Sequence, residues 1–106
     1  MDAMIGRIEA TPGNRDALAN ALVHDVDEMP GCLTYLVSVD PLDEDGVWIA
    51  EAWVSHDAHQ AWLESDATRA LVDTVRPLMV GYSERHDLRP VGGLAAIFGP
   101  SRSAQA

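Results

Sequence analysis

Two histidines near the middle of the chain have a spacing that suggests chemistry. His56 and His59 lie three residues apart at the start of a predicted helix, and this spacing can bring two imidazoles to one metal ion. The sequence offers no third ligand beside them, so we expect no metal site. An imidazole titrates near neutral pH, which makes His59 a candidate general base. The structural alternative is a surface histidine in the first turn of a helix.

A single glutamate is the second candidate. Glu51 is the only charged residue in the apolar run 47–54, which has the composition of a strand. A carboxylate in this setting needs a partner or must take up a proton. Arg7 or Arg85, on other predicted strands, would supply the partner in a structural ion pair. A catalytic base at Glu51 is the alternative.

Aromatic side chains are candidates for substrate contact. Trp62 lies on a predicted helix face from which it would stack on an aromatic ring, and packing in the core is the alternative. Trp48 and Trp53 fall on opposite faces of the third predicted strand, so one would face the helices and the other a subunit interface. The Tyr35 hydroxyl would reach either a substrate or the rim of the core.

Hydrophobic periodicity predicts the elements that position these residues. We expect strands at 3–10, 32–40, 47–54 and 82–89, a first helix capped by Asn14 that continues through Met29, and a second helix capped by Ser55. The second helix should pause near residues 65–66, and Pro77 should kink or end it. This order predicts an α+β fold of the ferredoxin-like, split βαβ type: a four-stranded antiparallel sheet with the helices on one face.

The third predicted strand is apolar on both faces, although helices would cover only one. Trp48, Ala50, Ala52 and Val54 alternate with Val47, Ile49 and Trp53. A strand of this kind must be covered on both sides. We therefore expect a homodimer in which two chains pack their sheets face to face.

Composition limits the partners and the number of domains. The chain has 106 residues, and its 17 acidic side chains against seven arginines, with no lysine, give a formal net charge of −10. Nucleic acid and anionic membranes require a cationic face, so both are excluded as expected partners. The sequence has no apolar run of 18 residues and no basic, apolar leader, and Cys32 is its single cysteine, so we expect a cytoplasmic protein. Residues 1–90 should form one domain, and residues 91–106 a tail that is flexible or docked on the partner subunit.

Several motifs carry a resemblance to a known family. Residues 3–89 resemble the antibiotic biosynthesis monooxygenase family of small dimeric α+β barrel proteins. The matching segments are Pro30-Gly31-Cys32-Leu33, Asp40-Pro41, Glu51-Ala52-Trp53-Val54-Ser55, Ala58-His59-Gln60-Ala61-Trp62-Leu63 and Ser65-Asp66. The resemblance implies a monooxygenase, or more broadly an oxidoreductase, that uses no cofactor and oxidises a small aromatic or polyketide-like phenol in a pocket between sheet and helices.

The same resemblance suggests roles for individual residues. Trp62, Trp48 and Leu71 would line the substrate pocket, and His59, Glu51 or Tyr35 would transfer protons. An isomerase or epimerase of a small carbonyl compound, and a non-catalytic dimer that binds a small ligand, are the alternatives on this fold.

Haem degradation, another activity of the family, is disfavoured. Haem-degrading members carry an Asn on the first strand and a His about two helical turns after the helix tryptophan. Here Gly6 stands at the first position, and the stretch after Trp62 contains Leu71 and no His before His86.

Overall fold

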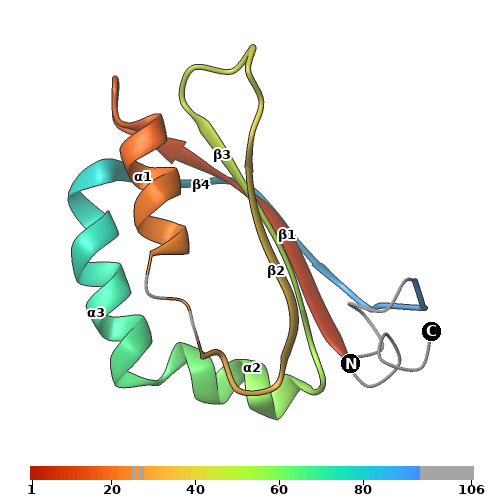
Figure 1. Cartoon of the computed structure of the whole chain (residues 1–106). Coiled ribbons are helices and arrows are strands. Elements are labelled where there is room, and N and C mark those ends of the chain that lie inside the picture. The colour runs from red at the N-terminus through yellow and green to blue at the C-terminus, as the bar shows by residue number, and fades with distance from the viewer. Residues whose placement is uncertain (25, 27, 94–106) are drawn as a thin grey trace.

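The computed structural model describes residues 1–24, 26 and 28–93 and confirms the predicted fold class (Figure 1). The strands are β1 (Asp2–Ala10), β2 (Cys32–Val39), β3 (Gly46–Trp53) and β4 (Met79–Leu88). The helices are α1 (Arg15–Val23), α2 (His56–Leu63) and α3 (Asp66–Val75), followed by the short 3₁₀ turn η1 (Arg76–Leu78).

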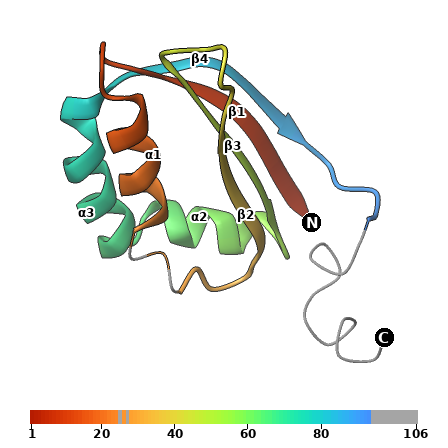
Figure 2. The ribbon, with the colours of Figure 1, turned by 45° about the horizontal axis from the view of Figure 1, so that its top comes forward.

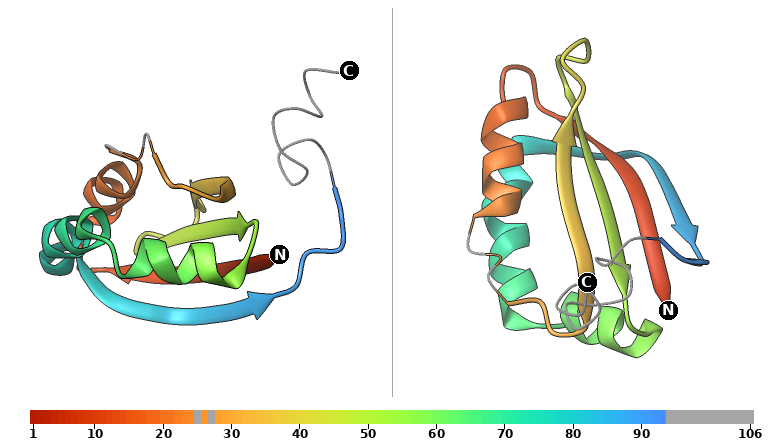
Figure 3. Two further views of the ribbon diagram at one scale, coloured as in Figure 1. Left: turned by 90° about the horizontal axis from the view of Figure 1, so that it is seen from below. Right: turned by 45° about the vertical axis from the view of Figure 1, so that its right-hand side comes forward.

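The four strands form one antiparallel sheet in the order β2-β3-β1-β4. The third strand is central and the fourth lies at an edge, as predicted. Helices α1 and α3 run side by side along one face of the sheet, and α2 crosses the end of that face (Figures 1 and 2). The opposite face carries no helix in the described part of the chain (Figure 3).

The hydrophobic core lies between the sheet and the pair α1 and α3. Ile8 of β1 and Val47 and Ile49 of β3 meet Leu18 and Leu22 of α1 there, and all five are buried. Alternation along the strands sends every second side chain toward the helices. Because β3 keeps this alternation to its end, Glu51 and Trp53 also face the helices.

The first helix is shorter than predicted. It ends at Val23, and His24 already has an extended backbone. The expected helix through Met29 is therefore wrong, because the acidic residues that follow Val23 in the sequence oppose the negative end of a helix dipole. The predicted cap is also wrong in detail: Asn14 occupies the cap position, but its side chain donates to Thr11 Oγ1 at 2.7 Å instead of accepting from the helix.

The second helical segment divides as predicted. The hydroxyls of Ser55 and Ser65 cap α2 and α3 by accepting hydrogen bonds from the backbone N–H groups of Ala58 and Thr68, at 3.0 and 3.2 Å. Pro77 lies in η1, where α3 ends, as expected for a residue without an N–H.

The last strand starts at Met79, three residues earlier than predicted. Its pairing with β1 shifts register twice, which leaves Val80 and Ser83 as extra residues on β4. Such bulges change which side chains face the core. β4 ends at Leu88, and residues 94–106 of the predicted tail lie outside the described residues, so the boundary at residue 90 stays a prediction. None of the helices in the described part of the chain combines the length and apolar character needed to cross a membrane.

Candidate active site

A cavity of about 240 Å³ lies between the helices and the inner face of the sheet. Its walls are mostly apolar side chains from β1, β3, α1, α2 and α3. The polar groups on the lining are Tyr35, Glu51, His59, Thr68, Tyr82 and Arg85. A concave, mainly apolar space with a few polar groups is the usual form of a small-molecule site.

Glu51 presents a buried carboxylate to this cavity. Its side chain is 9% exposed, and Oε1 accepts a hydrogen bond from Trp53 Nε1 at 3.1 Å and lies 3.1 Å from His59 Nε2. No hydrogen bond within the described residues reaches Oε2, which is nevertheless not sealed from the cavity or solvent. One carboxylate oxygen is thus held by its neighbours, and the other makes no hydrogen bond within the described residues.

The ion pair expected for Glu51 is not formed. Arg7 instead makes two hydrogen bonds to Asp43, from Nε at 2.8 Å and from Nη2 at 2.9 Å. Arg85 pairs with Asp87 at 3.3 Å. Arg7 lies on the opposite sheet face, because its neighbours Gly6 and Ile8 on β1 point toward the helices. The partner of Glu51 is therefore a histidine.

His59 is buried, not a surface residue of the first turn as the structural alternative assumed. Its ring stacks on that of Trp53, with centroids 5.0 Å apart and planes 8° apart. Nδ1 lies 2.9 Å from Asp2 Oδ2. The cap at Ser55 fixes the start of α2, and one turn later His59 points at the sheet. Both ring nitrogens of this histidine are engaged by carboxylates.

His59 Nε2 and Glu51 Oε1 face each other at ion-pair distance. Nδ1 donates to Asp2, since a carboxylate has no proton to offer, so a neutral ring would turn the bare Nε2 toward Glu51. Two acceptors 3.1 Å apart repel, so one of the two groups must carry a proton. The pair therefore contains either a protonated Glu51 with a neutral imidazole or a carboxylate with an imidazolium. A pair of this kind can transfer protons, and both residues line the cavity.

His56 does not form a metal site with His59. Its Nδ1 lies 3.3 Å from the same Asp2 oxygen that holds His59, and its side chain is 69% exposed. The described residues contain no cluster of three or more His, Cys, Asp or Glu placed to hold a metal ion.

Two residues of β4 join the site, of which the sequence had pointed to Arg85 alone, as an ion-pair partner of Glu51. Tyr82 and Arg85 both line the cavity, and Arg85 Cζ lies 5.6 Å from the centre of the Tyr82 ring. Strict alternation puts residues three apart on opposite faces, but the bulge at Ser83 brings both to the inner face. Gly6 makes room, because a Cβ there would lie 2.9 Å from the Tyr82 ring.

Electrostatics give Tyr82 and Arg85 different roles. Burial, and then the charge of Glu51, raise the pKa of Tyr82, so its hydroxyl stays a neutral donor at neutral pH. Among the described residues on the lining, Arg85 is the one arginine, and it is cationic at neutral pH. A ligand oxygen that becomes negative would find a donor and a cation at this wall.

Of the other predicted site residues, three line the cavity and one does not. Trp62 and Leu71 line the cavity. Tyr35 also lines it, but its hydroxyl donates to Leu22 O at 2.9 Å, and burial raises its pKa, so this hydroxyl supports α1. Trp48 is on the opposite face of β3, outside the cavity, and the geometry gives no support for a substrate contact there.

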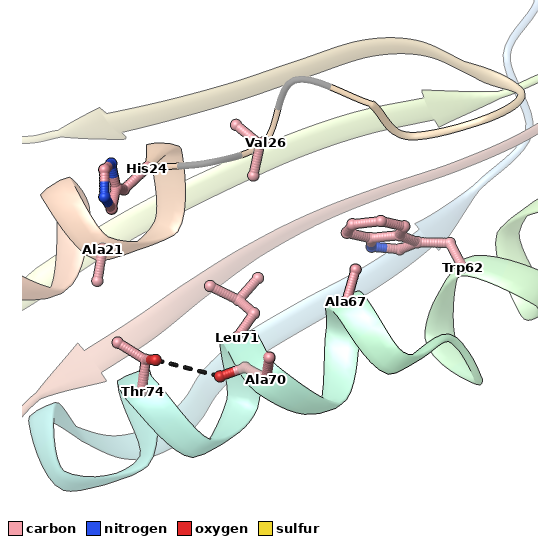
Figure 4. Close-up of a pocket in the computed structure, with 8 residues that line it drawn as sticks. All are labelled: Ala21, His24, Val26, Trp62, Ala67, Ala70, Leu71 and Thr74. Carbon is pink, nitrogen blue, oxygen red and sulfur yellow. Dashed lines mark hydrogen bonds between the residues drawn. The ribbon is translucent and has the colours of Figure 1, made fainter.

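Trp62 also lines two neighbouring hollows, of about 310 and 390 Å³. Figure 4 shows the first, where Trp62 and Leu71 face Ala21 and His24 of the α1 end across a space floored by Ala67. Trp62 and Leu71 are thus shared walls between this hollow and the cavity.

Comparisons with known proteins agree with this architecture. Residues 1–74 match the family described as antibiotic biosynthesis monooxygenase, and the chain belongs to that family. It is 43% identical to a proposed antibiotic biosynthesis monooxygenase from Chloroflexus aurantiacus, with a TM-score of 0.82 over 88% of this chain and 95% of that one. A second protein so described, from Deinococcus radiodurans, is 22% identical with a TM-score of 0.73, over 89% of this chain and 96% of that one, and shows the fold alone. No curated protein matches the chain.

Proposed function

We propose that this protein is a cofactor-independent monooxygenase that oxidises a small aromatic or polyketide-like phenol. The observation that carries the proposal is the buried Glu51–His59 pair, which lines a mainly apolar cavity. Membership of the monooxygenase family supports the same reaction class. Family membership alone would not give the chemistry, since one fold serves many reactions.

The size of the cavity limits the substrate. An apolar cavity of about 150 Å³ binds benzene. A cavity of about 240 Å³ therefore suits a substituted ring or two fused rings. Trp62 and the aliphatic walls would hold the ring, and the polar groups at the two ends would orient its oxygens.

The chain's own residues would prepare the substrate for oxygen. Glu51 Oε2 takes the proton from the phenol, and the phenolate oxygen lies against Tyr82 and Arg85. The electron-rich ring then transfers an electron to O₂, and a C–O bond forms at a ring carbon that carries hydrogen. The peroxide loses its O–O bond when that C–H proton leaves and the stored proton reaches the departing oxygen. One phenol and one O₂ thus give one quinone and one water, and a dry cavity protects the intermediates.

The residues do not favour haem as a substrate or cofactor here. An imidazole binds iron through a free nitrogen, and both nitrogens of His59 are engaged by Asp2 and Glu51. Gly6 offers no side chain, and the Tyr82 ring packs over it. These observations agree with the departures from the haem-degrading pattern in the sequence.

An isomerase or epimerase of a small carbonyl compound is the second candidate, and one observation favours it. The cavity holds a proton-transfer pair and, at another wall, a neutral tyrosine hydroxyl, which together supply a base and an acid. This reaction needs no oxygen. It predicts exchange of a ligand C–H with solvent deuterium in the absence of oxygen uptake.

Oxygen uptake by the metal-free purified protein, measured over a panel of dihydroxyarenes, tests the proposal. We expect uptake with at least one ring system, one atom of ¹⁸O₂ in the product and the other in water. Glu51→Gln should lower the rate by about 100-fold or more, because it removes the base. Glu64→Gln, an exposed change at the end of α2, is the matched control. Absence of uptake over the whole panel, or full activity of Glu51→Gln, contradicts the proposal.

We also propose that two chains pair through the face of the sheet that bears no helix. Ile5, Leu36, Trp48 and Ala50 share this face by register, and Leu36 is 60% exposed. Covering them removes apolar surface from water, which favours association. Sedimentation at micromolar concentration should give about twice 11.5 kDa, and Leu36→Glu should shift the chain toward monomer. A monomeric wild type contradicts the pairing. The cytoplasmic location stays a prediction.

A further inference from the structure

The second residue of the chain makes contacts that the proposed reaction has not used. Asp2 opens β1 opposite Trp53 of β3, so its side chain lies at the sheet end that α2 crosses. Its Oδ2 is 2.9 Å from His59 Nδ1 and 3.3 Å from His56 Nδ1. Its side chain is 25% exposed, whereas that of His59 is 5% exposed. Asp2 thus joins a buried imidazole to the surface.

The contact with Asp2 determines which nitrogen of His59 faces the cavity pair. Nδ1–H donates to the carboxylate, and this leaves Nε2 facing Glu51 Oε1 at 3.1 Å. The hydrogen bond on one ring nitrogen sets the protonation of the other. The hydrogen bond to Asp2 also fixes the rotation of the His59 ring. Stacking on Trp53 cannot do this alone, because a ring turned over by 180° would stack equally well.

We propose that Asp2 is the positioning residue of the Glu51–His59 pair: it holds the imidazole so that Nε2 faces Glu51 and so keeps Glu51 competent to take a proton. This rests on the proposed function, since the pair is taken to be the base of that reaction. Asp2 acts through His59 and lies outside the cavity lining. The site therefore includes a residue from the very start of the chain.

The charge of Asp2 suits this role. The hydrogen bond from His59 is the largest cause that lowers the pKa of Asp2, ahead of the smaller contribution from His56. Burial acts in the other direction but does not reverse the shift. The side chain is therefore a carboxylate at neutral pH, and an anionic acceptor makes a stronger hydrogen bond than a neutral one.

The contact with His56 is the weaker of the two. It is longer by 0.4 Å, from 2.9 to 3.3 Å, and His56 is largely exposed. Removal of His56 should therefore leave the orientation of His59 unchanged. This makes His56→Ala a control that separates loss of the Asp2 carboxylate from loss of its surface contact.

The experiment compares Asp2→Ala with Asp57→Ala, a change to an exposed carboxylate in the first turn of α2. In the wild type, the ¹H–¹⁵N spectrum of the imidazoles should show a slowly exchanging proton on His59 Nδ1. Asp2→Ala should lose that resonance and lower kcat about tenfold or more with KM within about twofold, since proton transfer is affected and the cavity wall is not. Added formate should partly restore both the His59 Nδ1 resonance and kcat.

Two results would overturn the proposal. One is an unchanged His59 Nδ1 resonance in Asp2→Ala, and the other is an equal loss in Asp57→Ala or His56→Ala. The spectrum is read without substrate, so it decides the positioning role even if the protein consumes no oxygen. Absence of oxygen uptake with the predicted spectra would refute the proposed function and leave the link between Asp2 and His59 intact.

Discussion

Replacement of His59 by phenylalanine tests whether the buried pair is held by its polar contacts or only by packing. Phenylalanine keeps a flat ring for Trp53 to stack on, so the aromatic contribution, about 0.5–1.5 kcal/mol, is largely retained. The variant removes both contacts of the imidazole, at 2.9 Å to Asp2 and 3.1 Å to Glu51. Loss of the partner of a fully buried charge costs about 3–5 kcal/mol. Trp53 still donates to Glu51 and the cavity can admit water, so the cost should be smaller here. We expect His59→Phe to lower the free energy of unfolding by about 2–3 kcal/mol.

Urea unfolding followed by circular dichroism, at one fixed protein concentration, measures this loss. Glu51→Leu in the same background should recover most of it, which gives a coupling energy of at least about 1.5 kcal/mol in the double-mutant cycle. His56→Phe, on the same helix but 69% exposed, should change the free energy of unfolding by less than about 0.5 kcal/mol. The reasoning is refuted if His59→Phe is as mild as His56→Phe, or if the effects of His59→Phe and Glu51→Leu simply add.

Three further predictions concern other parts of the structure. The guanidinium of Arg7 lowers the pKa of Asp43, so this ion pair stabilises the fold above the pKa of Asp43 in the unfolded chain, and the stabilisation is lost as pH falls through the lower pKa of the folded state. Asp43→Asn should therefore lower Tm at pH 7. A difference in Tm between variant and wild type that persists at pH 2 would contradict this. Burial raises the pKa of the Cys32 thiol to about 11, so native protein should react slowly with iodoacetamide at pH 8 and urea-unfolded protein quickly; equal rates would be evidence against it. Trp62→Ala should join the cavity to the adjacent hollows and raise the affinity for three-ring relative to one-ring phenols, measured by calorimetry. Gln60→Ala, an exposed change on the same helix outside the cavity lining, is the comparison, and an unchanged affinity ratio in Trp62→Ala would argue that Trp62 is no barrier.

The sequence was sufficient to predict the fold because its local signals agree with one another. Ser55 and Ser65 mark two helix starts, Pro77 marks an end, and the apolar third strand identifies the centre of the sheet. The first helix was overextended because Val26 and Met29 continue the helical period beyond Val23, where the chain has already left the helix. Hydrophobic periodicity shows which residues are apolar, but it does not show where the backbone hydrogen bonds of a helix end.

The sequence predicted several residues of the candidate site but not the contacts between them. Glu51 and His59 were identified separately, but their contact depends on α2 folding back over the end of β3, which no spacing reveals. An arginine partner for Glu51 was wrong because Arg7 lies on the other sheet face beside Asp43, and Arg85 pairs with Asp87. Tyr82 was missed, and Arg85 was named only as an ion-pair partner of Glu51, because a bulge, not alternation, sets the direction of both side chains. The signal available in the sequence was Tyr82 itself, an aromatic residue within a predicted edge strand that is otherwise polar.

The central claim is that the cavity takes a proton from a bound phenol, and it can be tested without oxygen. A dihydroxynaphthalene is mixed with the protein under argon at a pH below the pKa of the free phenol, and the absorbance of the phenolate is recorded. We predict that the phenolate band appears in proportion to bound ligand with the wild type and Glu64→Gln, and is lost with Glu51→Gln although the ligand still binds. A ligand that binds to the wild type only as the neutral phenol would contradict the account.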